Sequence, residues 1–129
     1  MNTLDSVIAA STFEQIPGLY CYAQLEELPQ GIFFMVTKDA SEISVVCTEE
    51  QLTDLKPHAV YESRYVLIAI NVSIPFTTVG FLAAVTECVA ARGCNVLVVS
   101  TYSKDYILIR QEQWEIAKEA LIQRGLKEK

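Results

Sequence analysis

The feature that most constrains the fold is the order of apolar and polar segments in the second half of the chain. Residues 65–70 form a continuous apolar run, partly β-branched, which predicts a buried strand. The polar, proline-bearing segment 71–75 ends this strand, and a helix is expected from about Thr77, with Gly93 as its C-terminal cap. The order β-α-β-β-α is completed by a strand over 94–101, a tight turn, a strand over 106–109 and an amphipathic helix over 112–124.

The first half repeats part of this order. Residues 20–23 predict a strand, and a hairpin is expected over 32–46. Thr48 and Gln51 have the spacing of a capping box, so a short helix should run from Glu49 to Leu55. Where the second half has its first helix, the first half has only a short loop. The chain therefore reads as an imperfect duplication, with units at 1–62 and 63–129, and the first unit lacks its first helix.

Each unit needs a further strand to complete its sheet. The candidates are Leu4 to Ala10, and Val60 to Glu62 continuing into the strand from Tyr65. The sequence leaves open which sheet each of them completes. An incomplete sheet exposes an edge and a face, and association of the two units and of two chains would cover both. A homodimer is therefore expected.

Composition and charge limit the classes of partner that the chain is expected to have. The chain has 129 residues, 51% of them hydrophobic, which suits one compact domain or two very small ones. Its net charge of −6 divides into −7 for residues 1–64 and +1 for residues 65–129. An acidic chain attracts neither phosphate backbones nor anionic lipids, so neither nucleic acid nor a membrane is expected as a partner. The apolar runs are shorter than a bilayer span, and residues 1–10 do not resemble a signal peptide, so a cytoplasmic protein is expected.

The cysteines and the histidine give no catalytic or metal-binding pattern. The four cysteines, which lie in or beside apolar runs and form no C-x-x-C motif, are expected to be buried free thiols. His58 is the one histidine, in a predicted loop. A zinc site or a nucleophile–histidine device needs more ligands or bases than this chain supplies. No cofactor, no metal and no enzymatic activity are therefore expected.

Two motifs in the second half resemble the ACT domain. They are residues 73–85, SIPFTTVGFLAAV, and residues 93–108, GCNVLVVSTYSKDYIL. The chain is similar to small bacterial tandem ACT-like proteins, related to aspartate kinase regulatory domains and to the cytosolic arginine sensor of animals. The resemblance implies an α+β, ferredoxin-like βαββαβ sandwich with two tandem units and antiparallel sheets, the first unit degenerate. The length excludes an aspartate kinase, since there is no room for its catalytic domain.

The resemblance implies that an amino acid binds where two such units meet, at the loop between the first strand and the first helix. A helix N-terminus offers unpaired backbone N–H groups and a positive dipole end, which suit a carboxylate. Gly80 allows either close approach of a ligand or partner, or tight packing of helix on sheet. The positions expected to bind here are Ser73, Ile74, Thr77, Thr78, Val79, Gly80 and Phe81.

The turn after residue 100 supplies the other half of the implied site. In the arginine-sensor branch an acidic residue in this turn helps to hold the ligand's ammonium group, and Asp105 stands at the matching place. A carboxylate suits an α-ammonium because their hydrogen bond is charge-assisted. The alternative is that Asp105 is a turn residue that bonds its own backbone. The expected positions are Ser100, Thr101, Ser103 and Asp105.

Two functions follow from these observations. The first is a non-catalytic regulatory protein that senses a small molecule, an amino acid, at an interface between ACT-like units. The second is a ligand-free interaction module that dimerises. Its mark in the sequence is the apolar stripe Phe81, Ala84, Cys88 and Ala91 on the predicted first helix of the second unit.

Overall fold

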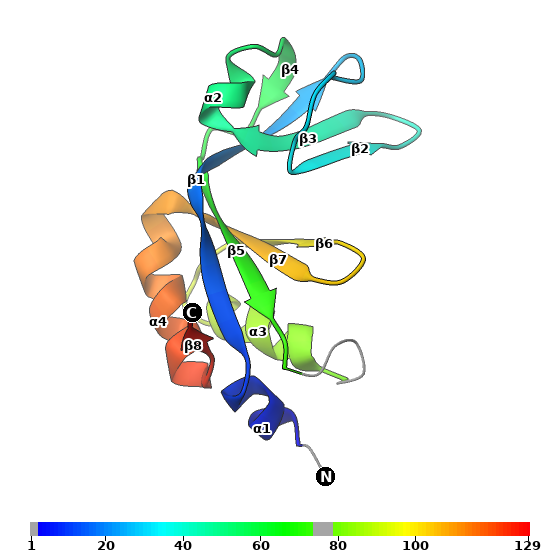
Figure 1. The fold of residues 1–129 in the computed structure, drawn as a ribbon. Coiled ribbons are helices and arrows are strands. Elements are labelled where there is room, and N and C mark those ends of the chain that lie inside the picture. The colour runs from blue at the N-terminus through cyan, green and yellow to red at the C-terminus, as the bar shows by residue number, and fades with distance from the viewer. Residues whose placement is uncertain (1–2, 74–78) are drawn as a thin grey trace. The chain divides into compact units, whose positions relative to one another are not determined.

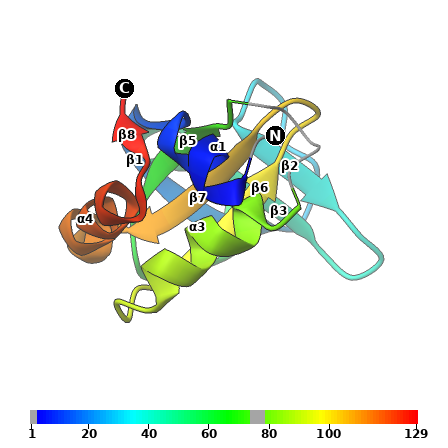
Figure 2. The same cartoon turned by 90° about the horizontal axis from the view of Figure 1, so that it is seen from below.

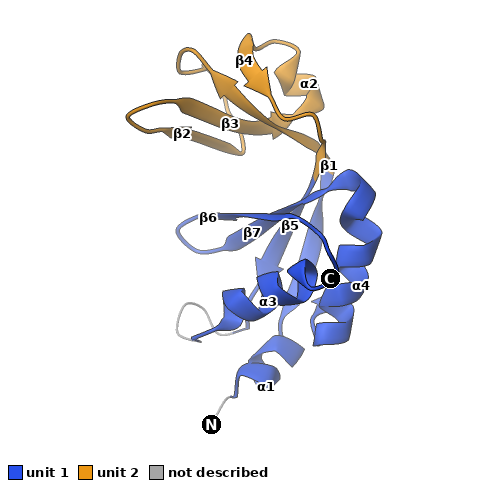
Figure 3. Cartoon of the chain, turned by 180° about the vertical axis from the view of Figure 1, so that it is seen from behind, with its two compact units in different colours: residues 1–17, 66–129 blue, residues 18–65 orange. Residues whose placement is uncertain are grey.

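The computed structural model describes residues 3–73 and 79–129, and the chain divides into two compact units. Unit 1 combines Met1–Pro17 with Val66–Lys129, and unit 2 is Gly18–Tyr65 (Figure 3). This division follows spatial contacts, and it places the N-terminal segment with the second half of the chain. The division into ACT-like repeats at 1–62 and 63–129 is a different one and stays a prediction.

Unit 1 contains most of the helical structure (Figure 1). Its elements are α1 (Leu4–Ala9), the first part of β1 (Thr12–Leu25), β5 (Tyr65–Asn71), α3 (Phe81–Ala90), β6 (Val96–Ser100), β7 (Asp105–Arg110), the 3-10 turn η1 (Gln111–Gln113), α4 (Trp114–Arg124) and β8 (Lys127–Glu128). The strand order is β1-β5-β7-β6, and β8 pairs with β1 in parallel. The α+β architecture with a βαββα order from β5 is therefore confirmed.

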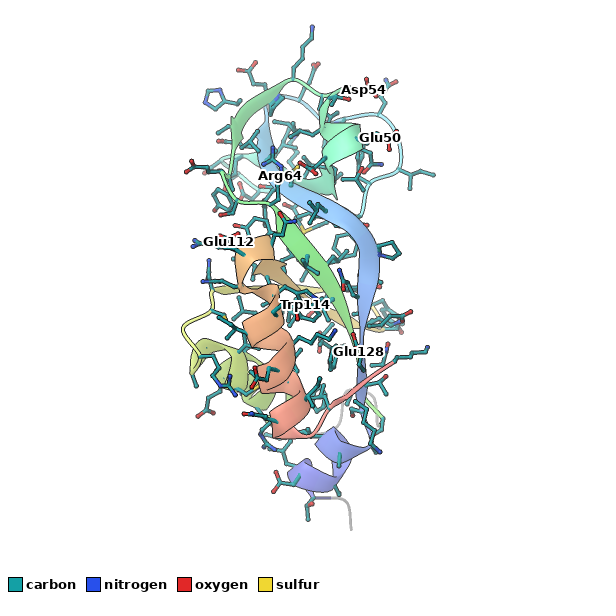
Figure 4. The ribbon with its side chains drawn as sticks, turned by 90° about the vertical axis from the view of Figure 1, so that its left-hand side faces the viewer. Glu50, Asp54, Arg64, Glu112, Trp114 and Glu128 are labelled. Carbon is teal, nitrogen blue, oxygen red and sulfur yellow. The ribbon has the colours of Figure 1, made fainter. Side chains whose placement is uncertain are left out.

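The two longer helices of unit 1 pack together against the sheet. α3 contacts α4 and β6, and α4 contacts β7 (Figure 2). As predicted, α4 buries Trp114, Ala117 and Leu121 and ends at Gly125, whose φ is +125°. Trp114 meets the buried Phe13 of β1 edge to face, with ring centroids 6.1 Å apart (Figure 4). This contact ties the C-terminal helix to the N-terminal strand.

The strand that completes the sheet of unit 1 was wrongly located. Leu4–Ala9 form the helix α1 rather than a strand, and Thr3 caps it: its hydroxyl accepts a hydrogen bond from the Ser6 N–H at 3.1 Å. The missing strand is the first part of β1, which lies beside β5. The sequence predicted a strand only over residues 20–23, whereas β1 runs for 14 residues and passes from unit 1 into unit 2.

The start of α3 also differs from the expectation. The helix begins at Phe81 rather than near Thr77, and its N-cap is Gly80. Gly80 has φ +88°, which is a left-handed conformation and cannot continue a right-handed helix toward its N-terminus. The predicted capping residues Thr77 and Thr78 lie outside the described residues.

Unit 2 is a small sheet with one short helix. It holds the rest of β1, β2 (Met35–Lys38), β3 (Ile43–Thr48), α2 (Glu49–Leu52) and β4 (Pro57–Val60). The order is β2-β3-β1, and β4 also pairs with β1, antiparallel. The capping box of Thr48 and Gln51 is confirmed. Val60, a candidate strand residue, ends β4 and lies opposite Ala23 of β1.

The first helix of a βαββαβ unit is absent from unit 2, as the sequence predicted, since residues 26–34 form turns and irregular chain. This segment contributes Phe33 to the core in place of a helix. Together with Leu52, Leu55 and Val60, Phe33 packs on a buried cluster that spans β1 and β3. The cluster is Ala23, Leu25, Ile43, Val45 and Cys47.

All four cysteines are free thiols, as expected, and only Cys88 is partly exposed. Cys21 of β1 lies opposite Cys47 of β3. Burial and the neighbouring Cys21 raise the pKa of the Cys47 thiol to about 11. Neither thiol of this pair is therefore an activated nucleophile at neutral pH. None of the helices in the described segments is long and apolar enough to cross a membrane.

Candidate functional site

Strand β5 brings Ser73 to a fixed position at the start of the predicted binding loop. The Ser73 N–H donates to Oγ of Ser11 at 3.0 Å, and the Ser73 hydroxyl donates to the carbonyl of Val7 at 3.2 Å. Ser11 is fully buried, and its own hydroxyl donates to the same carbonyl at 2.6 Å. Ser73 thus anchors the loop to the end of α1, and its hydroxyl already has a protein partner. Ser11 was not predicted, because a single serine between two apolar segments has no local pattern.

The loop itself is only partly described. Ile74, Thr77 and Thr78 lie outside the described residues. Val79 is 95% exposed, so its side chain lies on the surface. The loop therefore presents an apolar side chain directly before the N-terminus of α3.

Gly80 has a conformational reason to be glycine. A Cβ atom built on it would meet Cδ2 of Leu4 at 3.7 Å, which is an ordinary contact and does not crowd the site. The left-handed φ, and not tight packing among the described residues, therefore accounts for the glycine. Its carbonyl accepts the N–H of Ala84 at 2.9 Å, the first hydrogen bond of the helix.

The N-terminus of α3 has no side-chain cap from its N-cap residue, Gly80, and the first turn holds no acidic residue. Positive partial charge from the helix dipole and the first backbone N–H groups gathers here. Phe81, by contrast, is only 5% exposed, so its ring is part of the core of unit 1 and only its backbone is available at this position.

The second half of the predicted site is the β6–β7 turn. The hydroxyl of Ser100 donates to Oδ1 of Asp105 at 2.6 Å across the hairpin. Thr101 donates both its N–H and its hydroxyl to the carbonyl of Lys104, at 2.8 and 3.1 Å. Ser103 is exposed and Asp105 is half-buried. The Asp105 carboxylate thus accepts a hydrogen bond from the side chain of Ser100, and a carboxylate retains capacity for further donors.

The two halves lie on the same side of unit 1. Figures 1 and 3 show the β6–β7 turn and the start of α3 together on that side. The topology explains this. α3 returns the chain to the end of the sheet where β5 starts, and β6 then runs in the same direction as β5, so that the end of β6 lies near the start of α3. Val79, Gly80 and the turn from Ser100 to Asp105 therefore share one end of the unit.

Other polar features of the described residues lie elsewhere. No group of three or more His, Cys, Asp or Glu side chains in the described segments could hold a metal ion. Arg110 has a buried Nε atom without a hydrogen-bond partner among the described residues. Arg110 is the last residue of β7 and Asp105 is the first, so the two lie at different ends of this strand. A surface cavity of about 780 Å³ belongs to unit 2, where residues 25–30 and 54–56 line it.

Comparisons with known proteins agree with this fold. Residues 60–123 match the ACT domain family. A Vibrio cholerae protein of unknown function, described as a possible transport protein, has a TM-score of 0.74 at 20% identity over 95% of both chains. A protein from Agrobacterium tumefaciens has a TM-score of 0.72 at 23% identity over 92% of both chains.

The ligand-free regulatory subunit of aspartate kinase from Thermus thermophilus has a TM-score of 0.61 at 12% identity, over 88% of this chain and 95% of that one. At these identities the structural likenesses concern the fold alone. No curated protein matches the sequence.

Proposed function

We propose that the chain is a non-catalytic regulatory protein that binds a small molecule, an amino acid, because its residues 60–123 match the ACT domain family. The observation that carries the proposal is that the segment matching the family contains both the start of α3 and the β6–β7 turn, which lie on the same side of unit 1. Likeness in fold to a regulatory subunit of aspartate kinase supports the regulatory role. The binding site is proposed at an interface between ACT-like units, and the protein is proposed to act as a homodimer.

The proposed binding mode uses opposite charges at the two halves. The ligand's carboxylate meets the backbone N–H groups at the start of α3, where the dipole is positive and the first turn holds no acidic residue. The ligand's ammonium meets Asp105, whose carboxylate is held in place by Ser100. Val79, exposed beside the helix N-terminus, contacts the ligand's apolar atoms. Ser73, Ile74, Thr77, Thr78, Thr101 and Ser103 are proposed as the surrounding positions.

The absence of catalysis is part of this proposal. ACT domains are regulatory modules, and the four thiols of this chain are free, with three of them buried. The lone histidine, His58, is exposed on β4 of unit 2, and its Nδ1 lies 3.4 Å from a carboxylate oxygen of Glu26. Free thiols also support a reducing compartment, so the cytoplasm is the proposed location.

A thermal-shift screen against the L- and D-forms of the amino acids tests the proposal. A ligand present at about 100 times its Kd stabilises the folded state by about 2.7 kcal/mol, which moves the Tm by several degrees. We expect one L-amino acid to raise the Tm while its D-enantiomer does not. A well-folded protein whose Tm no amino acid shifts would contradict the proposal.

The second candidate function is a ligand-free interaction module. The observation that favours it is an apolar edge strand in unit 1, where Val98 of β6 is 42% exposed. The apolar stripe predicted on α3 supports it less, because Phe81 is buried within its own unit. A stable dimer whose Tm no amino acid changes in the thermal-shift screen would favour this second function.

A further inference from the structure

The sheet of unit 2 has the strand order of a complete βαββαβ unit, although one of the two helices is missing. β3 pairs with β2 and with β1, and β4 pairs with β1, so the order is β2-β3-β1-β4. All three pairs are antiparallel, which makes β2 parallel to β1 and β4 parallel to β3. Each parallel pair therefore needs a connection that crosses one face of the sheet.

Both connections cross the same face. Right-handed crossovers from β1 to β2 and from β3 to β4 lie on one face, because they run in opposite directions between strands of opposite direction. The contacts agree: Phe33 of the first connection and Leu52 of the second pack on the same buried cluster. All residues of unit 2 are described, and α2 in the second connection is its one helix (Figure 3). The helix position over β2 and β3 is therefore empty.

Apolar side chains stay exposed where this helix is missing. Val36 of β2 lies opposite Val45 of β3, which belongs to the buried cluster, so Val36 is on the helix-bearing face. Val36 is 39% exposed, and in the first connection Leu28 is 56% and Ile32 is 92% exposed. In unit 1 the corresponding connection is α3, which buries three of its large apolar side chains. Unit 2 thus leaves uncovered the kind of surface that unit 1 covers with a helix.

Ile32 is exposed although its backbone is held in place. Its carbonyl accepts a hydrogen bond from the Gln51 side chain at 2.9 Å, and the same side chain accepts the Thr48 N–H at 3.1 Å in the capping box. An anchored apolar side chain loses less conformational freedom on binding than a mobile one does. Beside this segment, the 780 Å³ cavity of unit 2 is lined by residues 25–30 and 54–56, and Leu28 is among them.

Charge selects a basic partner for this face. Residues 18–65 hold eight acidic and three basic side chains, a net charge of −5, and the rest of the chain carries −1. Three acids, Glu26, Glu27 and Asp54, line the cavity together with one base, Lys56. Two copies of unit 2 would repel each other, and unit 1 of a second copy would bring no excess of positive charge. A segment that carries lysine or arginine beside apolar side chains gains both kinds of contact.

We propose that unit 2 binds a basic amphipathic helix of another protein, which takes the place of the missing helix over β2 and β3. The apolar stripe of this helix contacts Leu28, Ile32 and Val36, and its flanking lysine or arginine side chains face the acids of the cavity. Apolar burial supplies affinity, and charge supplies orientation and selectivity. The inference goes beyond the proposed function, since it assigns a protein partner to unit 2 and requires no amino acid.

The first test uses three fluorescent peptides of about 18 residues, or five helical turns, in anisotropy titrations. The first peptide has a leucine stripe flanked by lysines, the second replaces each lysine with glutamate, and the third replaces each leucine with serine. We expect only the first to bind, and more weakly as salt is added. No binding of the first peptide up to about 1 mM overturns the proposal. Equal binding of the serine peptide also overturns it, because the apolar face would then play no part.

The second test compares Ile32→Lys with Ile122→Lys. Both isoleucines are exposed, at 92% and 49%, and both substitutions add the same charge, but Ile122 is on α4 in unit 1. Ile32→Lys should weaken binding of the leucine–lysine peptide by roughly 10-fold or more, since it removes an apolar contact and adds a repelling charge. Ile122→Lys should bind like the wild type. Circular dichroism confirms that both variants are folded, and equal affinities in the two overturn the proposal.

The third test addresses the acids of the cavity. Glu27→Lys should weaken binding of the leucine–lysine peptide by roughly 3- to 10-fold, because an attracting charge becomes a repelling one. Glu112→Lys is the matched control, since Glu112 is also exposed and lies in η1 of unit 1. An equal loss in both variants would mean that net charge alone attracts the peptide, and this would overturn the assigned surface.

A second copy is the competing occupant, and light scattering distinguishes it. A wild-type dimer that Ile32→Lys dissociates would place a second copy on this face and overturn the proposal. Failure of the proposed function has a different signature, because the peptide titrations contain no amino acid. A thermal-shift screen in which no amino acid changes the Tm contradicts the proposed function and leaves peptide binding as the measure of this inference.

Discussion

At the scale of single residues, the candidate site depends on positions whose role comes from backbone shape or from one hydrogen bond. Gly80 sets the start of α3 through its φ of +88°. Asp105 is oriented by the Ser100 hydroxyl at 2.6 Å. Each suggests a substitution that changes one property and leaves the neighbouring contacts in place.

Gly80→Val should destabilise the protein by about 1–3 kcal/mol, because a β-branched residue is strained at a left-handed φ. Urea unfolding followed by circular dichroism measures this loss. Gly80→Asn is the matched control, since asparagine adopts the left-handed conformation more readily and should lose less. Equal stability of the valine variant and the wild type would show that the backbone does not require glycine here.

Asp105→Asn should weaken binding of the amino acid identified in the screen by roughly 10- to 100-fold, the range expected for a hydrogen bond between charged groups. The amide oxygen can still accept from Ser100, so the turn should keep its shape. Titration calorimetry measures the affinity. Asp54→Asn removes a charge from an exposed position in unit 2 and should bind like the wild type. Unchanged affinity for Asp105→Asn would remove this carboxylate from the site.

At the scale of elements, the contact between α1 and the end of β5 determines where the binding loop starts. Ser11 is fully buried and connects Val7 of α1 to Ser73, which is 62 residues later in the chain. The loop begins from this anchored serine, so the N-terminal helix bears on the geometry of the candidate site. Neither the helix nor the connection was expected from the sequence.

Ser11→Ala should cost about 1–3 kcal/mol of unfolding free energy, because the Ser73 N–H loses its acceptor in a partly buried environment. Ser6→Ala is the matched control: its hydroxyl donates to the Thr3 carbonyl at 2.9 Å at an exposed position and should contribute little. Denaturant midpoints of the two variants provide the comparison. Similar losses of unfolding free energy in the two variants would mean that the buried hydrogen bonds of Ser11 contribute no more than an exposed one.

At the scale of the whole molecule, burial makes stability depend on alkaline pH. It raises the pKa values of Tyr20, Cys21, Tyr22, Cys47 and Cys88, and that of Cys47 from an ordinary 9.0 to about 11. The folded chain holds these protons to higher pH than the unfolded chain does. Stability is therefore complete below about pH 9 and falls as pH rises toward 11.

Urea unfolding at a series of pH values from 7 to 11 tests this dependence. The unfolding free energy should be flat at neutral pH and decline above about pH 9. The Cys47→Ala variant is less stable throughout, because it leaves a cavity, but its decline should be shallower because one titrating group has been removed. Parallel declines in the two proteins would show that Cys47 does not contribute.

Much of the fold was predictable because its determinants are local. The strand from Tyr65, the capping box at Thr48 and the end of the last helix at Gly125 each follow from residues within one or two turns of each other. The absence of a helix between β1 and β2 was also visible, since the segment is short and contains a proline. The candidate positions came from resemblance and stay a prediction, and the structure shows the start of α3 and the β6–β7 turn on the same side of unit 1.

The sequence by itself thus determined the α+β class, the order of elements after residue 65 and the absence of a helix between β1 and β2. Only the tertiary structure decided that residues 4–9 are a helix, that β1 is long enough to enter both units, and that Phe33 takes the place of a helix in the core. It also decided that Phe81 points inward and that Ser11 holds Ser73. The physical reason is that strand pairing and burial are settled between residues far apart in the chain, whereas periodicity and capping act over a few residues.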